Sequence, residues 1–409
     1  MGERQGETVQ LEITNVAHGG VMVSRLDGRV VFVSDAIPGE TVRAVISDDS
    51  KSAFWRAETV EVLAASEFRR PHIWPEAGIE RPPGERAGGA EFGHIGIDHQ
   101  RELKRKVLGD SLKRMAGIGV DAAVEALPGP EDGTGWRTRL RLHIADDGTP
   151  GPYAARSRRV VPVSSLPLAV PEAVAIAPLA ERFAPGGTID LVAPSTGAPF
   201  VLTEGMADRI VVERVEGREF RLDARGFWQV HREAAATLTD AVAAAVDESL
   251  FDPRAFNLDL YGGVGLLAAA VGDRFGATTR ITSVESDAAA TAHASRNLVE
   301  WRGASAVTGR VEHYLRRLCV SATQAERAQL ARATVILDPP RSGAGRSVVE
   351  SLLDLEPAQI VYVACDPVAL ARDVALLRDE GYELLALRAF DLFPNTHHLE
   401  AVARLVRTD

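Results

Sequence analysis

The sequence predicts an α/β protein of more than one domain, with a small β-rich domain at the N-terminus and a helix-covered parallel sheet at the C-terminus. Three observations predict this. A chain of 409 residues exceeds what one hydrophobic core usually serves. Residues from about 7 to 64 alternate short β-rich runs with Gly- and Pro-bearing turns. From about Phe227 onward, apolar strands alternate with helices, which is typical of a parallel sheet covered on both faces.

Composition limits the class of protein. Hydrophobic residues make up 45% and charged residues 25% of the chain, which excludes a wholly disordered, collagenous or coiled-coil protein. No stretch approaches the roughly 20 apolar residues of a membrane span, and the first residues are too polar for a secretory signal, so we expect a cytoplasmic protein without a membrane partner. The two cysteines, Cys319 and Cys365, are too few for a disulfide framework or a four-cysteine metal site.

Residues 1–65 are expected to form the first domain. Three signals follow one another there: Ala17-His18-Gly19-Gly20, the β-rich run Arg29 to Val33, and Ile37-Pro38-Gly39-Glu40. Their order resembles the TRAM domain, an OB-like barrel that binds RNA, and the resemblance covers almost all of residues 7–64. Some OB-like barrels are only structural, so a structural role for this domain stays open.

Residues 66–224 are expected to form an intermediate α+β domain with a basic face. Although the net charge of the chain is −11, twelve Lys or Arg stand against eight Asp or Glu between Arg101 and Arg159. Arg137, Arg139 and Arg141 alternate, so they would share one face of a strand. This charge either forms a solvated face or lines a groove for a phosphate backbone.

Residues 225–409 are expected to form the third domain, in which helices and strands alternate. After the first domain the sequence predicts, in chain order, a helix at 99–115, strands at 136–144 and 158–163, a helix at 231–248, a strand at 256–261, a helix at 264–272, a strand at 280–285, a helix at 287–301, strands at 333–338 and 359–364, a helix at 367–379 and a strand at 382–390.

A strand that runs directly into a glycine-rich turn indicates a cofactor. The strand predicted at 256–261 ends at Tyr261 and is followed by Gly262-Gly263-Val264-Gly265 and then by a helix. Glycines let the backbone approach a ligand, and a helix N-terminus favours polar groups. Glu285 ends the next strand, where a carboxylate can accept both ribose hydroxyls. A nicotinamide dinucleotide site would show a fuller G-x-G-x-x-G pattern, so S-adenosylmethionine is the favoured cofactor.

Two further strands end in residues that could do chemistry. Asp338 would face the crevice at the carboxyl edge of the sheet, unless it is a turn acid that caps the next element. Cys365 precedes a helix capped by Asp366, a position that lowers the pKa of a thiol, although the charge of Asp366 acts in the opposite sense. A lone cysteine is otherwise an inert buried side chain, which is our interpretation of Cys319.

Five motifs occur in a fixed order along the chain. They are Phe227-Trp228-Gln229-Val230-His231, Asp259-Leu260-Tyr261-Gly262-Gly263-Val264-Gly265, Asp338-Pro339-Pro340-Arg341, Ala364-Cys365-Asp366-Pro367 and Phe393-Pro394-Asn395-Thr396-His397-His398-Leu399-Glu400. With the TRAM-like start, they resemble the S-adenosylmethionine-dependent RNA 5-methyluridine methyltransferases over the whole chain. The resemblance implies a class I (Rossmann-like) methyltransferase domain at 225–409. It also implies methylation of uridine carbon 5 in a structured transfer or ribosomal RNA.

The resemblance implies roles for individual residues. Cys365 is expected to be the nucleophile and Glu400 the general base. The expected cofactor-binding residues are Gln229, Tyr261, Gly263, Gly265, Glu285 and Asp338. Chemistry gives a separate reason for the first two roles: carbon 5 of uracil is a weak nucleophile, so a thiolate first adds to carbon 6, and a base later removes the carbon-5 proton. We expect the target base to be flipped out of its stack.

The chain departs from the family pattern at several positions. Ala87-Gly88-Gly89-Ala90 stands where many members have Cys-Gly-Gly-Cys, and Leu166 at a later cysteine position, so we expect no metal cluster. Leu266, His231 and Arg310 replace residues that often contact the cofactor, which leaves those contacts open. Asp366 replaces a frequent Asn. The oligomeric state has no sequence signal, and a monomer is the default expectation.

Three alternatives stay open. The same cysteine addition would activate cytosine, so RNA 5-methylcytosine formation is the nearest alternative. A non-catalytic RNA-binding protein that retained the fold is less favoured, because such a protein would not need Cys365, Glu400, Glu285 and Asp338 together. A nicotinamide-dependent dehydrogenase is the weakest alternative.

Overall fold

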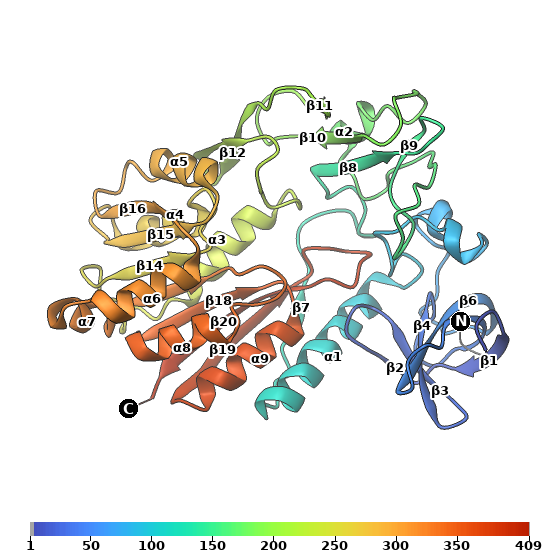
Figure 1. The fold of residues 1–409 in the computed structure, drawn as a ribbon, viewed down its shortest axis with the longest axis horizontal. Helices are drawn as coiled ribbons and strands as arrows, with labels where there is room; N and C mark the ends of the chain where they lie inside the picture. Colours follow the sequence, from blue (N-terminus) through green and yellow to red (C-terminus); the bar gives the residue numbers. More distant parts are fainter. Residues whose placement is uncertain (1–3, 409) are drawn as a thin grey trace.

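The N-terminal sheet lies at the lower right of the molecule in Figure 1, and the computed structural model describes residues 4–408. Its strands are β1 (Thr8–Glu12), β2 (Asn15–Val16), β3 (Met22–Leu26), β4 (Arg29–Ser34), β5 (Thr41–Asp48) and β6 (Phe54–Ala64). They are ordered β1-β5-β6-β4-β3-β2, antiparallel except for β4 beside β6. Successive side chains of a strand point to opposite faces. Val9 and Leu11 of β1 and Val42 and Ala44 of β5 therefore share one apolar core.

The middle of the chain forms a four-stranded sheet, a separate hairpin and one long helix. The elements are η1 (Pro75–Ala77), η2 (Pro83–Glu85), α1 (Ile97–Ala116), β7 (Val124–Glu125), β8 (Arg139–Ile144), β9 (Pro150–Gly151), α2 (Pro171–Ala175), β10 (Thr188–Val192), β11 (Phe200–Thr203), β12 (Ile210–Val215) and β13 (Arg218–Asp223). The sheet has the order β11-β10-β8-β9, and β12 pairs with β13. This part of the chain has its own hydrophobic core, in which Leu142 of β8 and Ile189 and Leu191 of β10 pack with Trp136.

The C-terminal sheet has eight strands and determines where the site lies. Its elements are α3 (Ala234–Ala245), β14 (Asn257–Leu260), α4 (Leu266–Phe275), β15 (Ile281–Glu285), α5 (Ala288–Asn297), β16 (Ala304–Thr308), α6 (Val311–Ser321), α7 (Gln324–Leu330), β17 (Thr334–Leu337), α8 (Arg346–Leu355), β18 (Gln359–Ala364), α9 (Pro367–Arg378), β19 (Tyr382–Phe390) and β20 (Glu400–Arg407). The order is β16-β15-β14-β17-β18-β20-β19-β7. The first five strands in this order are parallel to one another, whereas β20 is antiparallel to both β18 and β19.

Helices cover both faces of this sheet, which explains why its central strands are buried throughout. All residues of β14, β17 and β18 are buried, as expected of parallel strands covered on two sides. One core lies between the sheet and α1, α6, α8 and α9, and the other between the sheet and α3, α4 and the β12–β13 hairpin. Helix α1 and β7, which sequence reasoning placed in the intermediate domain, thus pack on the C-terminal sheet (Figure 1). The domain boundaries stay a prediction.

The predicted strand at residues 158–163 is wrong. Those residues form no strand, and their contact with the chain before them is an isolated bridge between Tyr153 and Val160. Pro162 lies inside the run and has no N–H to donate to a ladder, so it interrupts strand pairing. The elements predicted from the sequence also did not include α6 to α8, β10 to β13 or β16. The α/β fold class itself is confirmed.

Candidate active site

The topology of the C-terminal sheet brings the predicted site residues to one edge. The chain runs from β14 outward through β15 to β16, and then returns to start β17 on the other side of β14. Ligands of open α/β sheets bind at the carboxyl ends of the strands beside such a reversal. Tyr261, Glu285, Asp338 and Cys365 lie at or directly after the carboxyl ends of β14, β15, β17 and β18. Glu400 begins β20, which runs in the opposite direction, so it lies at the same edge.

Strand register makes Cys365 and Glu400 neighbours. Ala364, the last residue of β18, pairs with Ala401 of β20. Cys365 comes one residue after this pair and Glu400 one residue before it, so both leave the sheet at the same point. The Glu400 side chain is buried, with 4% of the residue exposed. Burial and the neighbouring Asp338 raise the pKa of the Glu400 carboxyl well above its usual range, and Arg341 opposes that shift.

The expectation that the helix N-terminus lowers the pKa of the Cys365 thiol is wrong. Burial raises this pKa to about 12, and the carboxyls of Glu400 and Asp338 act in the same direction. Arg341 works against the shift, whereas Asp366 adds to it. Loss of hydration disfavours a charged form, and here it outweighs the helix dipole. In the free protein, Cys365 is therefore a thiol at neutral pH.

The half-buried Asp338 and the buried Asp259 form an acidic pair close to Cys365. Burial raises the pKa of Asp338 to about 7, and the charge of Asp259 contributes. The pKa of Asp259 is raised to about 6, again mainly by burial, although Ser283 donates a 2.9 Å hydrogen bond to it. Gly262 packs on this bond so closely that any Cβ there would overlap the Ser283 hydroxyl. The first glycine of the turn, Gly262, is therefore required by packing.

The turn after β14 and the end of β15 form a cradle that fits a nucleoside. Glu285 Oε2 accepts the Gly263 amide at 3.1 Å, and Oε1 accepts the Asp287 amide at 2.8 Å, so the carboxylate is fixed on the backbone. Gly263 and Gly265 have φ of +54° and +89°. A Cβ at Gly263 would meet no atom within 4 Å, which leaves room beside the carboxylate for a ligand. An oriented carboxylate next to open backbone is what a ribose diol requires.

The remaining predicted cofactor residues have different surroundings. Tyr261 is half-buried with φ of +65°, a left-handed conformation that is rare for a bulky residue. Gln229 is half-buried and follows the buried Trp228 before α3. Its contact with the other site residues stays a prediction.

The three departures noted in the sequence also have different environments. His231 is buried and stacks on Trp136 with ring centroids 5.5 Å apart. Burial lowers its pKa to about 4, so it is a neutral packing residue. Leu266 is buried at the start of α4, and Arg310 is exposed before α6.

A pocket of about 170 Å³ opens at Cys365. Arg341, Lys104, His397 and His398 contribute its polar side chains, and residues 16–20 of the first domain form one wall. Arg341 belongs to the Asp338-Pro339-Pro340-Arg341 motif, but no role for it was expected from the sequence. Its exposed guanidinium is the cation that favours the anionic forms of Cys365 and Glu400.

The loop that carries Glu400 is anchored on α1. Lys104 Nζ lies 2.5 Å from Asp391 Oδ1 and 3.1 Å from the Phe393 carbonyl, and the Lys104 and Asp391 side chains are fully buried. Asn395, with φ of +66°, donates its backbone N–H to Gln100 Oε1 at 2.8 Å. The amphipathic pattern of α1 could not predict that Lys104 points inward, because its partner lies 287 residues away.

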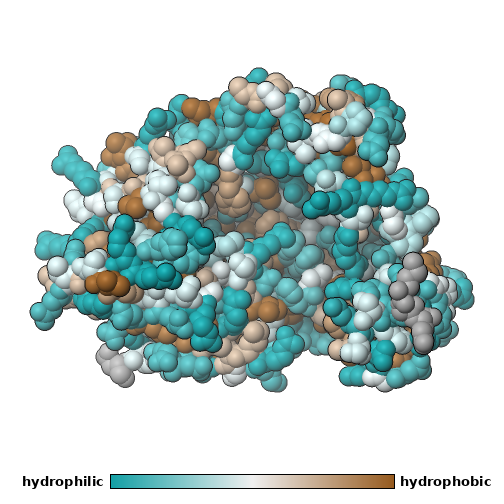
Figure 2. Space-filling view, viewed as in Figure 1, coloured by the Kyte–Doolittle hydropathy of each residue, from teal (hydrophilic) through white to brown (hydrophobic). Residues whose placement is uncertain are grey.

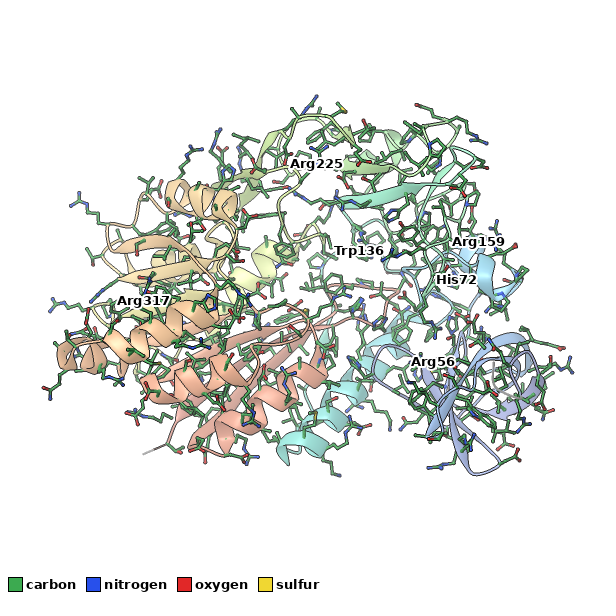
Figure 3. The ribbon with its side chains drawn as sticks, in the orientation of Figure 1. Arg56, His72, Trp136, Arg159, Arg225 and Arg317 are labelled. Carbon is green, nitrogen blue, oxygen red and sulfur yellow. The ribbon has the colours of Figure 1, made fainter. Side chains whose placement is uncertain are left out.

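A larger groove of about 760 Å³ lies between the first domain, α1 and the intermediate region. Arg56 of β6, Arg114 of α1 and Arg156 line it. Arg56 and His72, another lining residue, are labelled at the right of the molecule in Figure 3, and the side of the molecule seen in Figure 2 is hollowed near its middle. The cations of the groove therefore come from separate elements.

Some of the residues expected to form the basic face pair with acids of the protein or are buried, whereas others, such as Arg114 and Arg156, line the groove. Arg139 lies 3.0 Å from Glu213 and Arg141 lies 2.7 Å from Asp190, and Lys104 is buried. Two of the three alternating arginines are thus held in ion pairs, and the basic face of the intermediate domain stays a prediction.

The strand order, the glycine turn with its acidic partner and the carboxyl-edge site together define a class I methyltransferase fold with an N-terminal TRAM domain. The sequence model of the tRNA (uracil-5-)-methyltransferase family matches residues 202–408, and that of the TRAM domain matches residues 2–60. The chain belongs to the tRNA (uracil-5-)-methyltransferase family.

Individual relatives cover the whole chain. An uncharacterized RNA methyltransferase of Streptomyces avermitilis is 36% identical over 98% of both chains. The 23S rRNA (uracil(1939)-C(5))-methyltransferase RlmD of Pseudomonas fluorescens is 29% identical over 97% of this chain and 94% of its own. Among solved structures, the Pyrococcus abyssi tRNA (uracil-54, C5)-methyltransferase with S-adenosyl-L-homocysteine matches with a TM-score of 0.68. It is 22% identical and covers 99% of this chain and 100% of its own.

These findings confirm the predicted family, fold class and enzyme class, an S-adenosylmethionine-dependent RNA (uracil-5-)-methyltransferase. S-adenosylmethionine is its methyl donor and RNA its substrate. Among residues 4–408, no helix is both long and apolar enough to cross a membrane. In the same part of the chain, no three His, Cys, Asp or Glu side chains gather as metal ligands would. Ala87, Ala90 and Leu166 instead share one apolar cluster. The cytoplasmic location and the monomeric state stay predictions.

Proposed function

We propose that the enzyme methylates carbon 5 of a uridine in transfer or ribosomal RNA through a covalent adduct with Cys365. One observation carries the proposal: the register of β18 and β20 sets Cys365 beside Glu400 at the edge of the sheet where the cofactor cradle lies. A nucleophile and a base are needed on the same uracil ring, and the two residues have the chemistry for those roles.

The reaction begins when Cys365 loses its proton to solvent and its sulfur adds to carbon 6 of the uracil. The electron pair of the 5,6 double bond moves onto oxygen 4, and Arg341, which lines the same pocket, stabilises this enolate. Carbon 5 then uses the enolate electron pair to take the methyl group, and the pair of the broken sulfur–methyl bond would stay on the donor sulfur, which becomes a neutral thioether. Glu400, as a carboxylate, removes the carbon-5 proton. The electrons of that C–H bond re-form the double bond, and the C–S bond breaks with its pair returning to Cys365.

The cofactor pocket consists of Glu285 on the ribose, the Gly263–Gly265 turn, Tyr261, Gln229 and Asp338. When bound, S-adenosylmethionine supplies a methyl group on a positively charged sulfonium, and that charge favours the anionic forms of the neighbouring carboxyls and thiol. The site needs a nearby cation to ionise Cys365 and Glu400, because burial favours the neutral forms of both side chains.

RNA would enter along the groove lined by Arg56, Arg114 and Arg156, which shares its residues 16–20 and His397 with the pocket at Cys365. A flipped uridine of a loop could then reach the sulfur while the strand contacts the cations. In this proposal the TRAM domain (residues 1–65) and the intermediate domain (66–224) hold the RNA, and residues 225–409 perform the chemistry.

The test is to incubate the purified enzyme with S-adenosylmethionine and, separately, unmodified transfer and ribosomal RNA, and then to identify new nucleosides by mass spectrometry. We expect 5-methyluridine from one pool; 5-methylcytosine would replace the proposal by its nearest alternative. Cys365→Ala should abolish turnover while S-adenosylmethionine still binds, and Cys319→Ala is the matched control that should stay active. Glu400→Gln should accumulate a denaturation-resistant protein–RNA adduct, and its absence on a gel would contradict the role of Glu400.

A further inference from the structure

One loop of the TRAM domain touches both segments that carry the chemistry. His18, between β2 and β3, has its Nε2 2.6 Å from Oδ2 of Asp366, the residue after Cys365. Gly20 of the same loop has φ of +73° and lies so close to His397 that a Cβ at this glycine would overlap the His397 side chain. The segment with His397 leads into the general base. The pocket at the nucleophile is therefore built from both ends of the chain.

Buried ion pairs hold the TRAM domain in this place. Arg69 Nε lies 2.6 Å from Glu40 Oε1, and the Glu40 side chain is fully buried. Arg86 Nη1 lies 2.6 Å from Asp35 Oδ2, and its side chain is 4% exposed. Both arginines come from the segment after the TRAM sheet and both acids from the turns within it. The position of the His18 loop is thus fixed by contacts other than its own.

Asp366 connects His18 to the nucleophile. Its Oδ1 accepts the amides of Val368 and Ala369 at 3.0 and 2.8 Å and so caps α9, and its other oxygen meets His18. Burial acts against ionisation, but the bonds from His18 and the amides prevail and lower the pKa of Asp366. The carboxylate is therefore charged beside Cys365, where its negative charge disfavours a thiolate.

The histidine is placed to offset this charge. Its hydrogen bond to Asp366 raises the pKa of His18, while burial and Arg114 of α1 oppose the rise. The other charged or titratable side chains that face the same pocket are Lys104, Arg341, His397 and His398. A protonated His18 turns the adjacent carboxylate into a neutral pair, which removes one of the charges that oppose ionisation of the thiol.

We propose that His18 is a positioning residue for methyl transfer: the TRAM domain delivers it onto Asp366, where it neutralises the charge next to Cys365 and closes one wall of the nucleophile pocket. This inference rests on the proposed function, because it takes Cys365 as the nucleophile. It gives the TRAM domain a part in the chemical step in addition to any part in RNA binding.

The test compares His18→Ala, Asp366→Asn and the double variant, with His313→Ala as a control because His313 is an exposed histidine on α6. Three quantities are measured: the single-turnover methylation rate, the Kd for RNA, and the rate and pH profile of Cys365 alkylation by iodoacetamide without RNA. We expect His18→Ala to slow methylation and alkylation by about tenfold, which corresponds to one pKa unit of the thiol. The Kd for RNA should change less than about twofold, and the control should match the wild type.

Rescue by charge removal separates a positioning role from a merely structural one. Asn can still cap α9 but carries no charge, so Asp366→Asn should make His18 dispensable, and the double variant should match Asp366→Asn in both rates. Two results would overturn the inference: additive effects of the two substitutions, or a weaker Kd in His18→Ala with an unchanged alkylation profile. If Cys365→Ala still methylates RNA, the proposed function fails instead. The coupling of His18 to Asp366 would still be measured by the alkylation rates of Cys365 in His18→Ala, Asp366→Asn and the double variant.

Discussion

The neutral state of Cys365 gives a prediction that needs no RNA. Burial with the nearby carboxyls raises the pKa of this thiol from 9.0 to about 12. At a pH of about 8 the thiolate fraction would then fall from ~10⁻¹ to ~10⁻⁴, a decrease of ~10³-fold. Water that reaches the half-buried sulfur screens part of the effect of the neighbouring carboxyls on the thiol pKa. If this screening removes about one pKa unit of the shift, the thiolate fraction still decreases by at least ~10²-fold.

The assay is alkylation by iodoacetamide, followed by intact-mass spectrometry in a Cys319→Ala background. We expect the rate at Cys365 to keep rising by about tenfold per pH unit beyond the pKa of an ordinary thiol, because the rate follows the thiolate fraction. Cys365→Ala in the same background should take no label. A rate that levels off near a pH of about 8 would refute the reasoning, since it would mean that the helix N-terminus and Arg341 outweigh burial.

Three further predictions follow from buried charges and from the cofactor cradle. Glu400→Gln should raise the Tm at a pH of about 8 but not below about 4.5: the folded-state pKa of Glu400 lies above its unfolded value of 4.5, so folding loses stability as pH rises past that value. Equal Tm values in melts at both pH values would contradict this. Lys104→Met should lower the free energy of unfolding in urea by up to about 3–5 kcal/mol, because it leaves the buried Asp391 with only the more distant Arg101, at 3.4 Å; a loss below about 1 kcal/mol would argue against the buried pair. Glu285→Ala should weaken S-adenosylmethionine binding at least about tenfold, measured by calorimetry, with an unchanged Tm. An unchanged affinity would contradict the assignment of Glu285 to the ribose.

Local signals were enough to predict much of the catalytic domain. The observed bounds of β14, β15, β17, β18, α9 and β19 lie within one residue of the predicted ones at each end, because an apolar run that ends in glycine, proline or an acid carries its own boundaries. The same signals placed Glu285, Asp338 and Cys365 at strand ends. The strand at 158–163 was wrong because β-rich composition alone does not ensure a pairing partner.

Pairings between distant parts of the chain could not be predicted from local patterns. The neighbourhood of Cys365 and Glu400 depends on β20 being inserted between β18 and β19 in the reverse direction. Lys104 reads as one more cation of a basic helix, but its buried partner Asp391 makes it structural. The sign of the thiol pKa shift was mistaken for the same reason: a helix cap is visible in sequence, whereas the desolvation that outweighs it depends on what packs around the sulfur.

The sequence by itself determined the family, the fold class and the residue types that the reaction needs, because motifs and strand ends are written within a few consecutive residues. Only the tertiary structure decided which charges are buried, which cations line the groove, and that His18 of the first domain meets Asp366 across 348 positions of the chain. The physical reason is that burial and long-range electrostatics arise from the packing of domains against one another, and no local pattern encodes them.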